Sequence, residues 1–356
     1  MAQMRAVLIK NGKSDSAQDL YIGEAERPTL KEGVDLIIVK IKAFGANRMD
    51  IMQRRGMYPL PPGASTILGV EFSGTVEEPG TSDFKKDEPV FGLATGGAYA
   101  EYISVPAGMC TRKPDHVSWE QAAAVPENWL TAWQALFVIS EMKEGAKVLI
   151  HAGASGVGLA AIQLAKSFGA GMVIATAGTD EKVSFVAQHG AKGINYKTQD
   201  FPTEVLKLTQ DAGVDVLVDF IGASYWEKNL KSLARDGRMV MLGLMGGAKT
   251  EGPTDLSQIL YKRVRIEGTR QFSSLHSTRT DDRNAGTTLR SRSLEYQTNL
   301  LQDFSKKALD KVFARCKGDE GLDLVIHKVY DWKDVAAAHE EMEQAKNIGK
   351  IILTIS

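Results

Sequence analysis

The chain has 356 residues, which is long for one domain and favours two. Hydrophobic residues make up 43% and charged residues 24%, the profile of a globular protein rather than a disordered or coiled-coil one. The 43 Lys and Arg residues nearly balance the 44 Asp and Glu residues, so the net charge of −1 argues against nucleic acid or an anionic membrane as a partner.

Targeting signals and cysteines are sparse. Residues 1–10 lack the apolar core of a signal peptide, and the most apolar long stretch, residues 148–165, is interrupted by glycines and polar residues. The two cysteines, Cys110 and Cys316, are too few for a disulfide framework or a thiolate zinc cage. These features predict a cytoplasmic protein with no membrane association.

The first 125 residues predict an irregular β domain, because short strand patterns alternate with Gly, Pro and Asp turns. Ser118 precedes a helical pattern and is expected to cap it. The expected strands cover residues 5–10, 36–43, 70–77, 89–93 and 98–105.

From residue 145 onward, strand and helix patterns alternate, which predicts an α/β fold with a doubly wound parallel sheet. Strands are expected over residues 147–151, 172–175, 193–196, 214–219, 238–242 and 264–267, and helices over 159–168, 181–189, 202–209 and 224–233.

Residues 270–293 interrupt this rhythm, since they are rich in Ser, Thr, Arg and Asp and lack apolar periodicity. After them we expect a single helix over 294–317 and a last unit that returns to the first domain. That unit comprises a strand at 325–330, a helix at 334–344 and a strand at 350–355.

The strongest chemical signal is the glycine-rich turn Gly153-x-Ser155-Gly156-x-Gly158, between an apolar strand and a helix. Such a turn lets backbone amides approach a pyrophosphate at the positive end of the helix. The alternative is a tight turn with a purely structural role. The glycine-rich turn lies among six alternating strand and helix units, and this position favours dinucleotide binding over the structural alternative.

The second strand of the sheet predicts the choice of cofactor. Enzymes that use NAD usually end this strand with an acid that binds the ribose 2′-hydroxyl. Small donors and a lysine follow the strand here, which favours the 2′-phosphate of NADPH over NADH, although Asp180 and Glu181 argue the other way and Lys182 could be a solvated helix residue. The donors are Thr176, Gly178, Thr179 and Lys182.

Metal chemistry is not indicated. None of the six histidines lies in a cluster with the spacing of metal ligands, and no nucleophile–base pair is apparent. We therefore expect the nicotinamide itself to carry the reaction.

Several motifs together resemble the zinc-free quinone oxidoreductases of the medium-chain dehydrogenase/reductase superfamily. Asn47 and Val70 stand where zinc-containing relatives carry a cysteine and a histidine. The motifs cover residues 47–58, 61–63, 68–71, 126–132, 151–158, 194–196, 222–229, 243–247 and 346–350.

The resemblance implies a GroES-like domain formed by residues 1–126 and 294–356 and a Rossmann NADPH-binding domain at 127–269, with the site in the cleft between them. Residues 270–287 have no counterpart in relatives, so we expect an insert loop there or an artefact of the gene prediction. The resemblance also suggests a homodimer, formed through sheet edges near residues 238–242 and 264–267.

The same resemblance assigns site residues. Ser155, Gly156, Val157 and Gly158 would hold the pyrophosphate, and Thr179, Lys182 and Tyr196 the adenosine phosphate. The nicotinamide ribose would be flanked by Gly243, Leu244, Met245, Gly246, Thr288, Leu289 and Arg290, with Asn347 closing the site and Tyr58, Asn47 and Thr131 facing the nicotinamide and the quinone.

Plainer roles remain open for some of these. Tyr58 could pack in its proline-rich loop, and Arg290 and Arg292 could be solvated loop charges. Trp129 and Trp133 are more consistent with core positions than with a stacking platform for the quinone.

The predicted function is NADPH-dependent reduction of quinones, including ortho-quinones. The electrons could be transferred singly, and Tyr58 or Asn47 would stabilise the charge on the quinone oxygen. The alternatives are reduction of the double bond of an enal, enone or enoyl thioester, and a weakly catalytic NADPH-binding protein.

Overall fold

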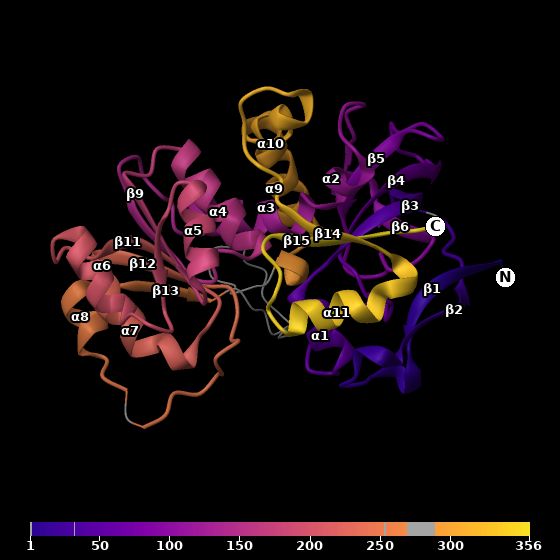
Figure 1. The fold of residues 1–356 in the computed structure, drawn as a ribbon. Coiled ribbons are helices and arrows are strands. Elements are labelled where there is room, and N and C mark those ends of the chain that lie inside the picture. The colour runs from indigo at the N-terminus through magenta and orange to yellow at the C-terminus, as the bar shows by residue number, and fades with distance from the viewer. Residues whose placement is uncertain (1, 32, 253, 269–288) are drawn as a thin grey trace. The chain divides into compact units, whose positions relative to one another are not determined.

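The computed structural model describes residues 2–31, 33–252, 254–268 and 289–356 (Figure 1). The chain divides into two units: Met1–Leu130 with Ser293–Ser356, and Thr131–Arg292. The expected insert at 270–287 and Thr288 lie outside the described residues. No helix among the described residues is long and apolar enough to cross a membrane.

The first unit is built on mostly antiparallel sheets, in which only the pairing of β14 with β15 is parallel among the described strands. Its larger sheet has the order β14-β15-β3-β4-β5-β7, with β6 also paired to β3, and β1 and β2 form a separate two-stranded sheet. The strands are β1 (Gln3–Ile9), β2 (Leu20–Glu26), β3 (Leu36–Ala46), β4 (Glu71–Glu78), β5 (Pro89–Leu93), β6 (Tyr102–Pro106), β7 (Cys110–Arg112), β14 (Ile326–Asp331) and β15 (Lys350–Thr354).

The carboxyl-terminal strand β15 pairs with β3, so the end of the chain lies in the first unit. Ile37, Val39 and Ile41 alternate along β3 and are buried in the core of this unit. The helices are α1 (Arg48–Arg54), α2 (Trp119–Ala123), α9 (Leu294–Lys307), α10 (Leu309–Phe313) and α11 (Val335–Glu343). Helix α3 (Pro126–Trp133) begins in this unit and ends in the second.

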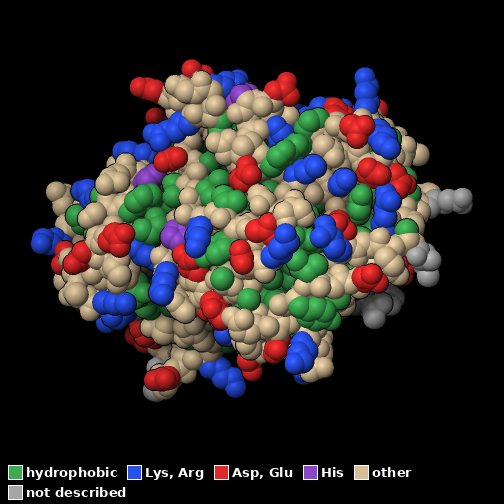
Figure 2. All heavy atoms as spheres, turned by 45° about the vertical axis from the view of Figure 1, so that its right-hand side comes forward, with side chains coloured by type: hydrophobic (Ala, Val, Ile, Leu, Met, Phe, Trp, Pro, Cys, Tyr) green, Lys and Arg blue, Asp and Glu red, His purple; other side chains and the backbone are tan. Residues whose placement is uncertain are grey.

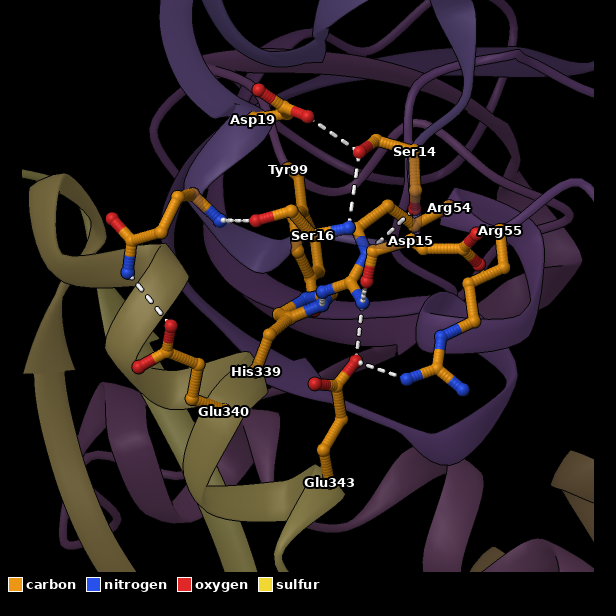
Figure 3. A network of polar contacts seen from close by, with 11 residues as sticks. Ser14, Asp15, Ser16, Asp19, Arg54, Arg55, Tyr99, His339, Glu340 and Glu343 are labelled. Carbon is orange, nitrogen blue, oxygen red and sulfur yellow. Dashed lines mark hydrogen bonds and ion pairs between the residues drawn. The ribbon is translucent and has the colours of Figure 1, made fainter.

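A buried polar network joins amino-terminal and carboxyl-terminal segments of this unit (Figure 3). The guanidinium of Arg54 has no exposure to solvent, donates to the carbonyl oxygens of Ser14 at 3.2 Å and Asp15 at 2.9 Å, and pairs with Glu343. Its Nη1 lies 3.4 Å from Nδ1 of His339 on α11. These contacts hold α1 and α11 together, although Arg54 and His339 are 285 residues apart along the chain.

The second unit contains a six-stranded parallel sheet in the order β10-β9-β8-β11-β12-β13, which confirms the predicted doubly wound α/β fold. Its strands are β8 (Lys147–Ile150), β9 (Met172–Ala177), β10 (Lys192–Asn195), β11 (Val214–Asp219), β12 (Leu233–Met241) and β13 (Arg265–Gly268). Its helices are α4 (Gly156–Ser167), α5 (Asp180–Gln188), α6 (Phe201–Thr209), α7 (Trp226–Ser232) and α8 (Ser257–Lys262).

The strand order reverses between β8 and β11, and ligands bind beyond the carboxyl ends of the strands at such a switch point. Leu149, Ile174 and Leu217 come from three neighbouring strands and are fully buried in the core of the sheet. Parallel strands buried on both faces explain the near-continuous apolar runs in the sequence.

One expected helix is wrong, two elements were not predicted, and the expected core positions of two tryptophans are confirmed. The single helix expected over 294–317 is wrong, because the backbone leaves helical geometry at Ala308, where φ is −131°. Strand β2 and helix α1 were not predicted, since neither shows a clear apolar period. Trp129 and Trp133 are 3% and 2% exposed, so both belong to the core, and Trp133 packs against Phe137 and Phe168.

Charge is mixed on the face of the molecule shown in Figure 2, where basic and acidic side chains are interspersed. This agrees with the near-balance of acidic and basic residues in the sequence.

Candidate functional site

The glycine-rich turn after β8 leads directly into α4, a helix of 12 residues. Ser155 caps this helix, because its Oγ accepts a hydrogen bond from the amide of Gly158 at 3.0 Å. A Cβ on Gly158 would lie 2.4 Å from the carbonyl oxygen of Ala152, so only glycine fits at this position. The amide groups of Gly156 and Val157 lie in the first turn, at the positive end of the helix dipole. This arrangement fits a dinucleotide pyrophosphate.

His151 connects the turn to the rest of the second unit. It is fully buried, with Nδ1 2.9 Å from Oγ1 of Thr176 and Nε2 2.8 Å from Oδ1 of Asn229. Burial lowers the pKa of His151 to about 4, so the ring is neutral at pH 7. Because the amide oxygen of Asn229 can only accept, Nε2 carries the proton and Nδ1 accepts from the threonine hydroxyl.

The residues predicted for the adenosine end come from the carboxyl ends of β9 and β10, which pair side by side. Thr179 caps α5, with its Oγ1 accepting from the amide of Lys182 at 3.2 Å. A Cβ on Gly178 would lie 2.7 Å from the hydroxyl of Tyr196, which is 43% exposed. The structure therefore brings Thr179, Lys182 and Tyr196 to one edge of the sheet.

A second loop pair holds the residues predicted to flank the nicotinamide ribose. Asp219 ends β11 fully buried, and its carboxylate accepts from the amides of Ile221 at 2.8 Å and Gly222 at 3.0 Å. Residues 220–223 are in turn hydrogen-bonded through the backbone to residues 245–247. Leu244 and Met245 are left 47% and 57% exposed, so two apolar side chains face solvent beside the glycines.

In the first unit, Asn47 belongs to a buried ionic cluster. The carboxylate of Glu71 is fully buried and forms an ion pair with the ammonium of Lys350, which is 4% exposed. Asn47 bridges the pair, since Nδ2 donates to Glu71 at 2.8 Å and Oδ1 accepts from Lys350 at 2.6 Å. The other oxygen of Glu71 accepts from the amide of Glu127 at 2.8 Å.

A bridge between a cation and an anion allows the Asn47 amide only one orientation. Its backbone amide donates to Asp50 at 2.8 Å, which fixes the start of α1. The role of Asn47 toward a quinone stays a prediction.

The remaining predicted residues lie in different parts of the fold. Tyr58 is half-buried in the loop after α1, and Thr131 is half-buried on α3. Asn347 is half-buried before β15, with Nδ2 donating to the carbonyl of Gly349 at 2.8 Å. Leu289 and Arg290 are 4% and 2% exposed, so Arg290 is not a solvated loop charge.

The donor set of the first unit differs from a metal centre. Val70 is fully buried and supplies no ligand, and the Lys350 ammonium already lies against Glu71 and Asn47. In the part of the chain that the structure describes, no three His, Cys, Asp or Glu side chains are grouped as metal ligands would be.

Sequence reasoning missed four polar residues of these clusters: Glu71, Asn128, Asp219 and Lys350. Their only sequence signal is a charged or amide side chain next to a run of apolar residues, as with Lys350 before Ile351. Asp219 was read only as the end of a strand. A buried polar residue must be paired, but the sequence does not say with what.

The chain matches two family definitions. Residues 33–115 match the alcohol dehydrogenase GroES-like domain, and residues 156–282 match the zinc-binding dehydrogenase domain. A GroES-like unit joined to a Rossmann-type sheet defines an oxidoreductase that uses a nicotinamide dinucleotide.

Relatives refine this class. Quinone oxidoreductase-like protein 2 of Mus musculus is 35% identical over 255 residues, which cover 70% of this chain and 71% of that protein. Quinone oxidoreductase 1 of Escherichia coli is 32% identical over 321 residues, which cover 89% of this chain and 90% of that protein. The chain belongs to the medium-chain dehydrogenase/reductase superfamily, among its quinone oxidoreductase-like members.

Solved structures agree with this fold. A mycobacterial protein in complex with NADPH superimposes with a TM-score of 0.78 at 27% identity and covers 99% of both chains. CurK enoyl reductase superimposes with a TM-score of 0.79 at 25% identity over the full length of both chains.

Proposed function

We propose that the chain is an NADPH-dependent quinone oxidoreductase that works without a metal ion. The observation that carries this proposal is the capped glycine turn, Ser155 to Gly158, at the switch point of the parallel sheet. Bound NADPH would supply the reducing equivalents, and the chain's own residues would bind and orient it and the acceptor. The quinone oxidoreductases among the relatives support the choice of acceptor.

The residues around α5 support NADPH over NADH. Oδ1 of Asp180, the acid that would favour NADH, already accepts a hydrogen bond from Nδ2 of Asn195 at 2.7 Å. The capping hydroxyl of Thr179, the side chain of Lys182 and the hydroxyl of Tyr196 come from the same edge of the sheet. A 2′-phosphate fits this set of donors.

Replacing Lys182 with Ala is therefore expected to raise the Kd of NADPH about tenfold, because one charge-assisted hydrogen bond to phosphate contributes about 1.5–3 kcal/mol. The Kd of NADH should stay within about twofold. Both constants can be measured from the quenching of tryptophan fluorescence. Equal weakening of the two nucleotides would show that Lys182 does not contact the 2′-phosphate.

The reaction itself is tested with purified chain, NADPH or NADH, and two acceptors, 1,2-naphthoquinone and a 2-alkenal, with and without a zinc chelator. We expect turnover of the quinone with NADPH and no effect of the chelator. Loss of turnover on chelation would refute the metal-free mechanism. Binding of NADPH without turnover of any acceptor would instead identify a weakly catalytic nucleotide-binding protein.

Reduction of an activated carbon–carbon double bond is the second candidate. It is favoured by the likeness to CurK enoyl reductase, at 25% identity over the full chain. Faster turnover of the 2-alkenal than of the quinone would select it.

We also propose a homodimer formed through β13. Of the two predicted edges, residues 238–242 are excluded because β12 lies between β11 and β13. Among the described residues, β13 has no neighbour on its far side. In antiparallel pairing about a two-fold axis at Ile266, Arg265 of each copy would face Glu267 of the other, which pairs opposite charges.

Substituting Arg265→Glu should raise the dissociation constant of the dimer about tenfold, since two pairs of like charges would then face each other. Adding Glu267→Arg in the same chain should restore it by exchanging the two charges. Sedimentation velocity over a range of concentrations measures both effects. A wild-type chain that sediments as a monomer would refute the proposal.

A further inference from the structure

Asn128, at the amino-terminal end of α3, is 5% exposed, and its amide orientation is fixed. Oδ1 lies 3.4 Å from the ammonium of Lys350. Because an ammonium can only donate hydrogen bonds, the oxygen and not the nitrogen of the amide must face it. Nδ2 therefore points away from Lys350 with both of its hydrogens, and the described residues offer it no acceptor.

The ammonium that sets this orientation cannot move freely. Lys350 is 4% exposed and is held by the Glu71 carboxylate and by Oδ1 of Asn47 at 2.6 Å. Glu71 also accepts from the amide of Glu127, the residue before Asn128, which ties the start of α3 to the same cluster. The cluster thus fixes both the backbone and the side chain of Asn128.

Although the side chain is only 5% exposed, Nδ2 is not among the fully buried atoms that lack a hydrogen-bond partner, so this donor is still open to solvent or to a ligand. A bound ligand with an exposed oxygen would provide the missing acceptor. Reduction of a quinone or an enone places negative charge on a carbonyl oxygen, where a fixed donor stabilises it most. On α3, Asn128 and Thr131 are three residues apart and share a helix face.

We propose that Asn128 is a substrate-binding residue, whose Nδ2 donates a hydrogen bond to the carbonyl oxygen of the acceptor, and that Lys350 is the positioning residue that sets its amide. This inference rests on the proposed function and names the donor within it. The ligand class is a planar acceptor with a carbonyl oxygen.

The test replaces Asn128 with Asp, which keeps the size of the side chain and the acceptor for Lys350 but removes the donor. We expect kcat/KM for 1,2-naphthoquinone to fall about 10- to 100-fold, while the Kd of NADPH stays within about twofold. Asn128→Ala, which adds no charge, should give a similar loss. The exposed Asn11→Asp is the matched control and should leave all constants unchanged.

The role of Lys350 is tested with a double variant that carries both Lys350→Met and Glu71→Gln. Both charges of the ion pair are then removed, so neither remains buried without its partner. This double variant should lower kcat/KM for the quinone with little change in the Kd of NADPH, and the loss should largely disappear when Asn128→Ala is already present. A variant that only weakened the fold would lower kcat/KM by the same factor whether or not Asn128 is present.

A second measurement is independent of turnover. The side-chain amide protons of Asn128, assigned in the NMR spectrum by their absence from Asn128→Asp, should shift when 1,2-naphthoquinone is added. Unchanged kcat/KM in both Asn128 variants, or an amide signal that does not respond, would overturn the inference. Equal loss of NADPH affinity would also overturn it. A wild-type chain without quinone turnover would refute the proposed function, and the NMR titration would still decide on Asn128.

Discussion

Replacing Lys350 with Met is expected to lower the free energy of unfolding by about 3–5 kcal/mol, because the Glu71 carboxylate would stay buried without its cation. Its hydrogen bonds from Asn47 and from the amide of Glu127 would remain, but neither carries a full positive charge. Urea denaturation followed by circular dichroism measures the loss.

Glu71→Gln in the Lys350→Met background is the control. A neutral amide does not need a cation, so the double variant should recover a large part of the loss. Substitution of an exposed pair, such as Arg263 with Asp236, should change stability by less than about 1 kcal/mol. A Lys350→Met chain as stable as wild type would mean that the pair contributes nothing to the fold.

The packing around the pair leaves little room for water to replace the ammonium. A Cβ on Gly45 would lie 2.3 Å from Oε1 of Glu71 and 2.7 Å from Cε of Lys350. The backbone of β3 therefore closes over the two side chains, and the lost charge cannot be solvated without moving that strand.

Acidification from pH 6.5 to 4 is expected to destabilise the protein through two buried histidines. Burial, reinforced by the nearby Arg54, lowers the pKa of His339 to about 3, and burial lowers the pKa of His151 to about 4. Below pH 6.5 the unfolded chain binds protons at these positions and the folded chain does not, so stability falls as the pH falls. Each histidine contributes a slope of about 1.4 kcal/mol per pH unit in this range.

Asp219 acts in the opposite direction, because burial raises the pKa of its carboxyl to about 6. The folded chain then binds the additional proton between pH 6 and about 3.8, which adds stability on acidification. The net slope is therefore expected to be smaller than the two histidines alone would give.

Variants separate these contributions in urea titrations at several pH values. His339→Gln should reduce the slope of the unfolding free energy against pH by about 1.4 kcal/mol per pH unit, which corresponds to one proton. Asp219→Asn should make this slope steeper below pH 6. The slope is read independently of any overall loss of stability. An unchanged slope in His339→Gln would show that this histidine does not titrate with folding.

Local sequence patterns were sufficient for the sheet of the second unit, although they did not predict helix α8. The alternation of apolar strands and helices predicted its sheet, since each helix and strand is shaped by the period of its own residues. The turn from Gly153 to Gly158 could be recognised for the same reason, because its glycines, its cap and its helix are neighbours in sequence. The resemblance singled out Asn47, but it did not predict that this side chain bridges Glu71 and Lys350.

Other parts of the fold could not be read in this way. Helix α1 hides Asp50 and Arg54, two charged residues, in the core, so its pattern looks solvent-exposed in the sequence. Their burial is stabilised by Tyr99, His339 and Glu343, which come from distant segments.

By itself, the sequence determined the α/β class and the glycine-rich turn that opens α4, because periodicity and turn chemistry act between near neighbours. Only the tertiary structure decided which buried charges meet. Asn47 and Lys350 are 303 residues apart, and the ion pair with Glu71 and the orientation of Asn128 exist only once β15 pairs with β3. A buried charge requires a partner, but which residue serves depends on the packing of the whole unit.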